Sequence, residues 1–491
     1  MSNFVLSDQV NQEKVFLLRY SQVIGRLDPV YYQSVDNLPL VKQTVYPVYK
    51  LSNVITMQRG RFGHRPRNDP AFYGGKYPFI QTGDIVKASQ SDGKIVYSQT
   101  LNEKGVNTSR LFQPNVLVMT IAANIGDTAI LDYPACFPDS LIALYPKDER
   151  LNINYLNIYF KFIKPYLEKL APQSAQKNIN IQQLSPMPII VPPEDRQRQI
   201  CLKYDKAVQI KQQKLVQAQQ LLAGINHYLL KELGIVLPKK DTSLQSRIFT
   251  VPIRAVSGER FDPKRYDKNV KDLKRAIEGN RFDSTKLKTL IVSSRAGDWG
   301  KDDNTNLGNE YCRCLVVRAT EFDNVYNLKL ENNRVKHRLI QQKKLIDIDI
   351  RPNDLLIEKS GGSLDQPVGR VAILREELLT KEPICYSNFI HKIRVNSQKV
   401  LPEYLFCFLK TVHHIKLTDA MQSQTNGIRN LIMPDYLEQT IPLPHLAKQN
   451  EIVTYIQDLR DRAKQLQAEA NQALVQAKQE IEQMILGDNM Q

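Results

Sequence analysis

The chain has 491 residues, and 42% of them are hydrophobic, which supports folded cores and excludes an intrinsically disordered protein. Lys and Arg exceed Asp and Glu by 16 charges, which favours a polyanionic partner such as a phosphate backbone, although a surplus that serves only solubility would give the same count. No apolar run approaches the roughly 18 residues of a membrane span and the N-terminus lacks the pattern of a signal peptide, so we expect a cytoplasmic protein.

The first half begins with the motif RLDPVYY at residues 26–32 and continues as a strand-rich body. Short runs of β-forming residues at 77–80, 115–120 and 128–131 are separated by Gly, Pro, Asn and Asp, which is typical of strands joined by turns. An aromatic segment at 155–160 then predicts a helix. We therefore expect a mixed α+β domain.

A long helix is predicted from Glu194 to Leu233, because this stretch contains no proline and glycine only at Gly224. Apolar residues recur every seven positions at 208, 215, 222 and 229, which places one apolar stripe along the helix. At 1.5 Å per residue the helix would be roughly 60 Å long, and a stripe of that length must be buried. Residues 238–243 (PKKDTS) then form a linker to the second half.

The second half repeats the first in the same order. RFDPKRY at 260–266 answers RLDPVYY at an offset of 260 − 26 = 234 residues. Two further pairs follow, FQPNVLV at 112–118 with IRPNDLL at 350–356 and IGDTAIL at 125–131 with VGRVAIL at 368–374. A unit of this length is too long for a solenoid repeat, and it predicts two homologous domains related by a pseudo-twofold axis.

A second long helix is predicted at 447–486, with apolar residues spaced by threes and fours from Ile452 to Met484. Each long helix would be able to pack on its own domain, but their equal length and equivalent positions favour pairing in one antiparallel coiled coil. The predicted fold class is therefore α+β, with two homologous domains and two long helices. The predicted divisions are 1–193 (N-terminal segment and first domain), 194–233 (first helix), 234–259 (linker), 260–446 (second domain) and 447–491 (second helix).

Familiar catalytic motifs are absent from the sequence, among them the phosphate loop, the dinucleotide-binding glycines, the nucleophile elbow and HExxH. The nearest approach to a nuclease site is Asp354 with Glu358 and Lys359. Metal-dependent cleavage needs an acid and a lysine on one strand face, whereas Glu358 and Lys359 are adjacent and would point to opposite faces. The six cysteines and seven histidines form no zinc pattern, so we expect reduced thiols and no metal. We expect no enzyme activity; an unrecognised active site would rest on the Asp354 cluster alone.

Two loops have compositions suited to DNA. Residues 59–67 (RGRFGHRPR) hold four arginines broken by glycine and proline, so they cannot form a regular helix and would reach phosphates or guanine edges. A solvated surface loop is the plain alternative. Residues 359–363 (KSGGS) would cradle a phosphate with backbone amides, or simply connect two strands.

The residues predicted to contact DNA are basic and amide side chains in turns. They are Arg59, Arg61, Arg65, Arg67, Lys87, Gln176, Lys177 and Asn178 in the first body, and Arg295, Lys301, Arg318, Lys359, Gln424, Asn426 and Arg429 in the second. The pairs Gln176 with Asn178 and Gln424 with Asn426 fall at matching places before the proline segments, which favours them over the others.

The ordered repetition of these features resembles the DNA specificity subunit of type I restriction-modification systems, over nearly the whole chain from about Arg26 to Leu486. The resemblance rests on the repeated RLDP and RFDP motifs, the strand-rich bodies, the long helices, and the segments IVPPEDRQRQI at 190–200 and IPLPHLAKQNEI at 441–452.

This resemblance implies that each body is a target recognition domain for one half of a bipartite, asymmetric DNA site. It also implies that the paired helices set the distance between the halves, and that the subunit is non-catalytic. The expected partners are double-stranded DNA, two adenine methyltransferase subunits, which bind S-adenosylmethionine, and the motor and endonuclease subunits of a full complex. No cofactor is expected on this chain. A free-standing repressor or architectural DNA-binding protein would share the charge and the duplication without a methyltransferase partner.

Overall fold

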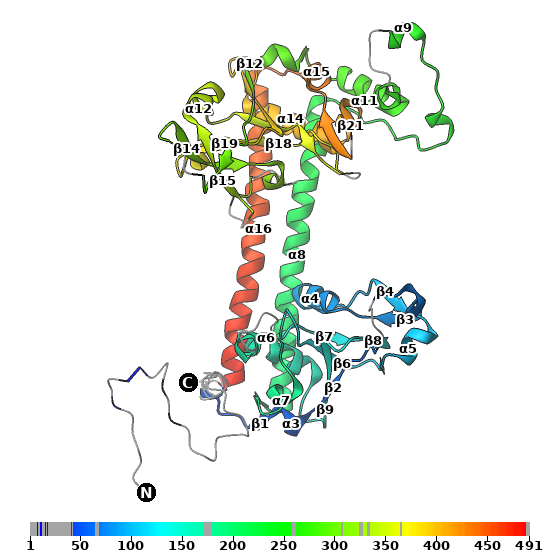
Figure 1. Cartoon of the computed structure of the whole chain (residues 1–491), viewed down its shortest axis with the longest axis vertical. Helices are drawn as coiled ribbons and strands as arrows, with labels where there is room; N and C mark the ends of the chain where they lie inside the picture. The colour runs from blue at the N-terminus through cyan, green and yellow to red at the C-terminus, as the bar shows by residue number, and fades with distance from the viewer. Residues whose placement is uncertain are drawn as a thin grey trace. The chain divides into compact units, whose positions relative to one another are not determined.

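The computed structural model describes residues 43–63, 68–170, 178–257, 262–305, 308–323, 328–330, 334–363, 366–425 and 427–487, together with residues 7, 10, 11, 15, 17 and 41. The motif at 26–32 and the first two residues of its second copy, 260–261, lie outside this set. The chain divides into two compact units, Met1–Lys214 with Ala468–Gln491, and Leu215–Gln467. Each unit therefore contains one strand-rich body and a part of both long helices (Figure 1).

Two four-stranded sheets form the body of the first unit. The first sheet is antiparallel, in the order β2 (Ile55–Arg59), β9 (Leu141–Pro146), β6 (Val116–Thr120) and β7 (Thr128–Leu131). The second has the order β4 (Gln99–Leu101), β3 (Tyr73–Phe79), β8 (Ala135–Cys136) and β5 (Leu111–Phe112), and its β3–β8 pair is parallel. Strand β6 is buried throughout, because its alternate side chains pack towards helix α6 (Ile153–Leu170) and helix α4 (Thr82–Gln90).

The second unit repeats the antiparallel sheet and the parallel strand pair, but the outer strands of its other sheet differ. Its antiparallel sheet has the order β12 (Ile291–Ala296), β20 (Ile390–Val395), β16 (Leu355–Glu358) and β18 (Val371–Ile373). A second sheet has the order β13 (Lys301–Asp302), β15 (Lys336–Gln341), β14 (Tyr311–Val317) and β19 (Ile384–Tyr386), and its β14–β19 pair is again parallel. The second unit adds a small sheet in the order β17 (Ser360–Gly361), β22 (Ile428–Leu431) and β21 (Gln422–Thr425). The predicted α+β class with two homologous domains is confirmed.

The turns that lead into β6 and β16 explain why the repeat is visible in the sequence. Asn115 and Asn353 both have positive φ, 63° and 67°, a conformation that asparagine tolerates better than most residues. Their backbone N–H groups donate to Leu131 O and Leu374 O, at 2.8 Å in both units. Because the turn requires this conformation, the Pro-Asn pair is retained while its neighbours vary.

Each aromatic helix is tied to the proline segment of its own unit. The Tyr155 hydroxyl of α6 donates to Ile190 O at 2.8 Å, and the Tyr404 hydroxyl of α14 (Pro402–His414) donates to Pro442 O at 2.8 Å. Both tyrosines are fully buried, so an unpaired hydroxyl would be costly there. The proline segments supply the strands β10 (Pro188–Ile190) and β23 (Thr440–Pro442). Strand β10 pairs with β1 (Val48–Lys50), and β23 pairs with β11 (Ser284–Lys286).

The long helices are α8 (Glu194–Leu233) and α16 (Leu446–Leu486). Both end at a glycine with positive φ, Gly234 (70°) and Gly487 (84°), which is the usual left-handed helix stop. The two helices run antiparallel within each unit. In the first unit Lys203 pairs with Glu480, and Lys214 with Glu469 at 2.6 Å; in the second, Glu232 pairs with Lys448 at 2.8 Å, and the rings of Tyr228 and Tyr455 lie 4.2 Å apart.

The predicted stripe of α16 is mostly buried, whereas on α8 Leu229 is buried and residues 208, 215 and 222 are half-buried; both stripes also contribute to the cores of the bodies. The last turns of α16 place Ile481 and Ile485 in the core of the first unit, beside Ile200 of α8. The last turns of α8 place Ile225 and Leu229 in the core of the second unit. Packing on a domain and pairing of the two helices were the alternatives, and both occur, because each stripe contacts the partner helix and a body. In the part of the chain that is described, no helix is both long and apolar enough to cross a membrane.

Candidate nucleic-acid interface

The antiparallel sheet of each unit ends in a group of loops, which we call the loop edge. The end of β2 and the end of β6 flank the start of β9, and the ends of β12 and β16 flank the start of β20 in the same way. As far as they are described, the loop edges comprise residues 59–63, 120–127, 137–141 and 178–180 in the first unit, and 295–299, 358–370, 386–390 and 422–431 in the second. In the second unit, Val368 N–H in the loop before β18 donates to Gln422 Oε1 of β21 at 3.2 Å.

A glycine fixes the arginine-rich turn of the first loop edge. A Cβ at Gly60 would overlap Pro138 O and the Phe137 ring, so only glycine fits against this neighbouring chain. The Arg61 N–H donates to Phe137 O at 3.0 Å, which holds the turn in place. Arg59 and Arg61 flank this glycine, and both side chains are exposed.

The second loop edge contains the same turn with different side chains. A Cβ at Gly297 would overlap the backbone oxygens of Tyr386 and Ser387, and the Asp298 N–H donates to Tyr386 O at 2.9 Å. The flanking residues are Ala296 and Asp298, where the first unit has two arginines. The backbone of the turn is therefore shared by the units, and its chemistry is not.

A second shared feature joins the loop after β6 or β16 to a strand close to the proline segment. In the first unit Asn178 bridges to Ala122, and Ile179 N–H donates to Ile121 O at 3.0 Å. In the second, β17 pairs with β22, so that Ser360 lies opposite Asn430 and Leu431 N–H donates to Lys359 O at 2.7 Å. This register aligns Asn178 with Asn430, a residue absent from the sequence-based set, and not with Asn426.

The loop edges bring together about half of the residues that were predicted to contact DNA. Arg59, Arg61 and Asn178 lie on the first, and Arg295, Lys359, Gln424 and Arg429 on the second. Arg295 and Gln424 are exposed, whereas Arg429 is only 7% exposed. The predicted residues Arg65, Arg67, Gln176, Lys177 and Asn426 lie outside the described residues.

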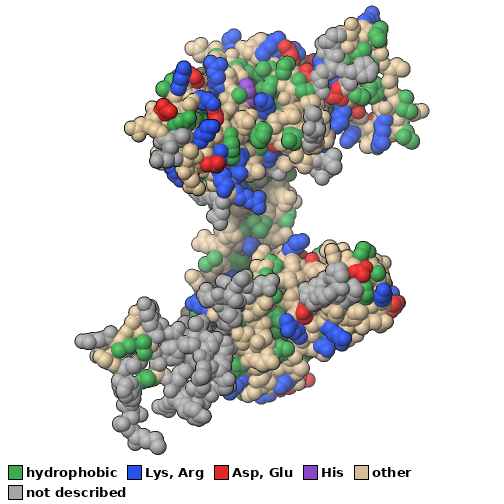
Figure 2. All heavy atoms as spheres, viewed as in Figure 1, with side chains coloured by type: hydrophobic (Ala, Val, Ile, Leu, Met, Phe, Trp, Pro, Cys, Tyr) green, Lys and Arg blue, Asp and Glu red, His purple; other side chains and the backbone are tan. Residues whose placement is uncertain are grey.

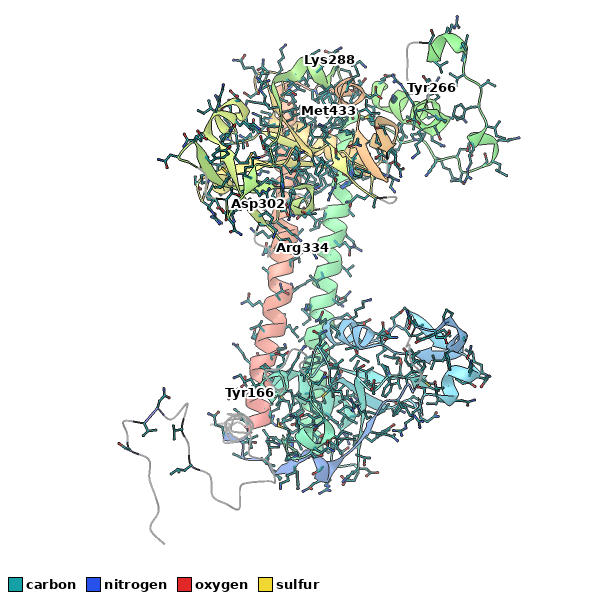
Figure 3. The ribbon with its side chains drawn as sticks, in the orientation of Figure 1. Tyr166, Tyr266, Lys288, Asp302, Arg334 and Met433 are labelled. Atoms are coloured by element: carbon teal, nitrogen blue, oxygen red, sulfur yellow. The ribbon has the colours of Figure 1, made fainter. Side chains whose placement is uncertain are left out.

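Three predicted residues lie elsewhere. Lys87 is exposed on the second turn of α4, a helix whose Thr82 hydroxyl contacts Ser140 of the loop edge at 3.1 Å. Lys301 is exposed on β13. The guanidinium of Arg318 is bound to the buried Glu321 carboxylate at 2.8 Å and to the carbonyl of Arg334, so it stabilises its own turn. Asp302 and Arg334 lie on the side of this unit opposite to Lys288 (Figure 3), which precedes the start of β12, whereas the loop edge is at the end of that strand.

The acidic cluster considered as a nuclease site consists of two buried ion pairs. Asp354 accepts two hydrogen bonds from Arg394, at 2.7 and 2.8 Å, and Glu358 accepts two from Arg370, at 2.8 and 2.9 Å. Both carboxylates are fully buried. Their oxygens are therefore committed to arginine. Over the described ranges, no group of His, Cys, Asp and Glu has the arrangement of a metal site, and all six cysteines are unpaired.

Burial lowers the pKa of two side chains of β20, the strand that starts at the second loop edge. Burial lowers the pKa of His391, and the nearby Lys359 lowers it further, so its imidazole is held neutral beside the Ser294 hydroxyl at 2.7 Å. Burial also lowers the pKa of Lys392, which the Asp354 carboxylate opposes from 3.5 Å. Lys and Arg side chains are visible on the surfaces of both units (Figure 2).

The features typical of a duplicated nucleic-acid-binding protein are present: two copies of one α+β domain, basic and amide side chains at each loop edge, and 16 surplus positive charges. A family model described as "Type I restriction modification DNA specificity domain" matches residues 46–220 and 295–476, which make up more than half of the chain. The chain belongs to this family of type I restriction-modification specificity subunits.

A solved structure agrees with the fold. A chain from "Structural basis underlying complex assembly and conformational transition of the type I R-M system" is similar with a TM-score of 0.51 and 14% identity, over 90% of this chain and 96% of that one. The type I restriction-modification system S subunit from M. genitalium matches with a TM-score of 0.41 and 13% identity, over 91% of this chain and 97% of that one.

Proposed function

We propose that each unit recognises one half of a bipartite, asymmetric DNA site, and that the helices scaffold two adenine methyltransferase subunits. The observation that carries this proposal is the shared turn at Gly60 and Gly297, which presents Arg59 and Arg61 in one unit but Ala296 and Asp298 in the other. A common backbone with different side chains is suited to two unlike DNA sequences, because base edges are distinguished by the donors and acceptors that meet them.

The helices support the partner half of the proposal. Both are about forty residues long, both follow a proline segment, and both end at a left-handed glycine. Two equivalent platforms are suited to two copies of one partner. In this proposal the partner is an adenine methyltransferase, which binds S-adenosylmethionine, while this chain binds no cofactor and performs no catalysis. Motor and endonuclease subunits would join the same assembly for restriction.

The helices would also set the non-specific spacer between the two half-sites. Inserting or deleting residues in matched numbers in both helices, at positions that keep the stripe in phase, should change the spacer and leave both half-sites unchanged, because each added residue lengthens a helix by about 1.5 Å.

Co-expression with the genes that neighbour this one in its genome tests the proposal. We expect an adenine methyltransferase to co-purify with this chain, and the complex to bind specific duplex DNA. Binding of DNA by the chain alone, with no methyltransferase recovered, would favour a free-standing repressor or architectural protein. Turnover of DNA by the isolated chain with Mg²⁺ or S-adenosylmethionine would contradict the non-catalytic role.

A further inference from the structure

Among the described residues of the second loop edge, two large hydrophobic side chains are exposed to solvent. Phe389 is 53% exposed and Ile428 is 52% exposed. Single exposed hydrophobic residues are common on protein surfaces. These two, however, both border the segment Lys359–Gly362 at the edge where the basic and amide residues gather.

Phe389 is held in a fixed position. It lies in the tight turn between β19 and β20, where Ile390 N–H donates to Ser387 O at 2.9 Å. Its own carbonyl accepts two hydrogen bonds, from Lys359 N–H at 2.8 Å and from Ser360 N–H at 3.2 Å. The exposed ring is therefore attached to a backbone that two strands fix, as a recognition residue requires.

Ile428 is positioned by the adjacent hairpin. It begins β22, pairs with Thr425 of β21, and follows Gly427, whose φ of 78° permits the turn. The hairpin is attached to the segment under Phe389, because the Ser360 hydroxyl contacts Asn430 Oδ1 at 2.6 Å. Both apolar side chains thus belong to one hydrogen-bonded platform.

The surface of this platform is suited to a nucleic acid. Gly361 and Gly362 carry no side chain and are exposed, so a phosphate backbone could approach the main chain closely. Lys359 and the exposed Arg295 lie on the same loop edge and supply positive charge. An apolar residue held beside such groups is suited to the thymine methyl group or to the face of a base at a flexible step.

We infer that Phe389, supported by Ile428, makes an apolar contact with bases of the half-site recognised by the second unit. The inference rests on the proposed function. In the first unit the position of Phe389 is occupied by Ser140, because each of these residues directly precedes the strand whose first residue pairs with the end of β6 or β16. The contact therefore belongs to one half-site only and contributes to the asymmetry of the recognised sequence.

The test uses the chain in complex with its methyltransferase partner. Phe389→Ser introduces the residue found in the first unit, and Val292→Ala is the control, because Val292 is 61% exposed near the other end of β12. Fluorescence anisotropy measures binding to a duplex that contains the site methylated by the parent complex. Mapping of N6-methyladenine gives the recognised motif. We expect Phe389→Ser to weaken binding about tenfold and to relax one position of one half-site, without changing the thermal midpoint. Val292→Ala should leave the affinity, the motif and the thermal midpoint unchanged.

Two outcomes overturn the inference in distinguishable ways. If the parent complex binds specifically and Phe389→Ser has the same affinity and motif, Phe389 does not contact bases and the proposed function is untouched. If the parent complex binds no specific DNA, the proposed function fails, and this inference fails with it. Should Phe389→Ser unfold the unit, Phe389→Ala and Ile428→Ala remove apolar surface without adding a polar group, and an unchanged motif with both variants would equally contradict the contact. Replacing thymine by uracil in the half-site distinguishes a methyl contact, where the variant's effect disappears, from insertion at a base step, where it remains.

Discussion

Gln197 and Gln449 make the same three hydrogen bonds in their respective units. Each is fully buried at the fifth position after a proline, on the first turn of a long helix. Each side-chain oxygen accepts from the backbone N–H just before the aromatic helix, and each side-chain nitrogen donates to a carbonyl two residues earlier and to that proline. The contacts are Asn152 N (2.9 Å), Arg150 O (2.7 Å) and Pro192 O (2.8 Å) for Gln197, and Leu401 N (2.8 Å), Lys399 O (3.2 Å) and Pro444 O (2.7 Å) for Gln449.

Replacing either glutamine should therefore destabilise the unit that contains it. Gln449→Leu leaves backbone groups without partners in a buried site, and we expect the free energy of unfolding to fall by about 3 kcal/mol. Gln213→Ala, on the exposed side of α8, should change it by less than about 0.5 kcal/mol. Chemical denaturation measures both. Equal effects of Gln449→Leu and Gln213→Ala on the free energy of unfolding would show that the shared glutamine does not connect the helix to the body.

The glycine turns of the loop edges should tolerate no side chain. Gly60→Ala and Gly297→Ala force an overlap with neighbouring backbone, and we expect each to cost about 2 kcal/mol or more and to lower DNA affinity. Gly224→Ala is the matched control, because Gly224 is an interior residue of α8 and a Cβ there meets nothing within 4 Å. That change should stabilise the chain by about 1 kcal/mol. A stable Gly297→Ala variant would contradict the close packing against Tyr386.

The buried charges of the second unit should be interdependent. Asp354→Asn leaves the fully buried Lys392 and the guanidinium of Arg394 without their shared carboxylate, and we expect a loss of about 3 to 5 kcal/mol in the free energy of unfolding. Asp349→Asn removes a half-exposed partner of Arg394 and should cost about 1 kcal/mol or less. The first unit has the buried Val116 in the position of Asp354, so the fold itself does not require this acid. A loss below 1 kcal/mol for Asp354→Asn would contradict the account.

Stability should depend on pH through a buried lysine. Burial lowers the pKa of Lys410 to about 8, from an ordinary value of 10.5. Between pH 8 and 10.5 the unfolded chain holds this proton and the folded chain releases it, so the contribution of Lys410 to stability rises with pH in this window. Below pH 8 both states are protonated and the contribution is constant.

Replacing Lys410 by methionine should remove this dependence. Lys410→Met should therefore stabilise the chain most below pH 8, and its advantage over the parent should shrink as the pH rises towards 10.5. The exposed Lys343→Met serves as the control. Thermal midpoints recorded from pH 6 to 10 compare the three proteins, and an advantage of Lys410→Met that is constant across this range would contradict the pKa shift.

The sequence predicted the features whose chemistry is local. The Pro-Asn turns before β6 and β16 are recognisable because a positive φ restricts the choice of residue, and the helix stripes because a long apolar face must be buried. The fold class followed from the order in which these features repeat. Arg318 had a local signal against a DNA role, since Glu321 lies three residues later and captures its guanidinium.

Features that depend on distant pairing were not visible. The equivalence of Gly60 and Gly297 is hidden because their neighbours differ, and only the contact with the chain before β9 or β20 reveals it. Asn430 aligns with Asn178 through a strand pair that joins residues 70 positions apart, at Ser360. The exposure of Phe389 likewise follows from a turn that three-dimensional packing defines.

The central claim, that each unit recognises its own half-site, is tested most directly by mapping N6-methyladenine genome-wide. The parent chain with its methyltransferase is compared with a variant in which Arg59 and Arg61 are both alanine. We predict a bipartite, asymmetric motif for the parent, and for the variant a motif relaxed or lost in one half with the other half and the spacer unchanged. A single uninterrupted motif, or equal changes in both halves, would contradict it.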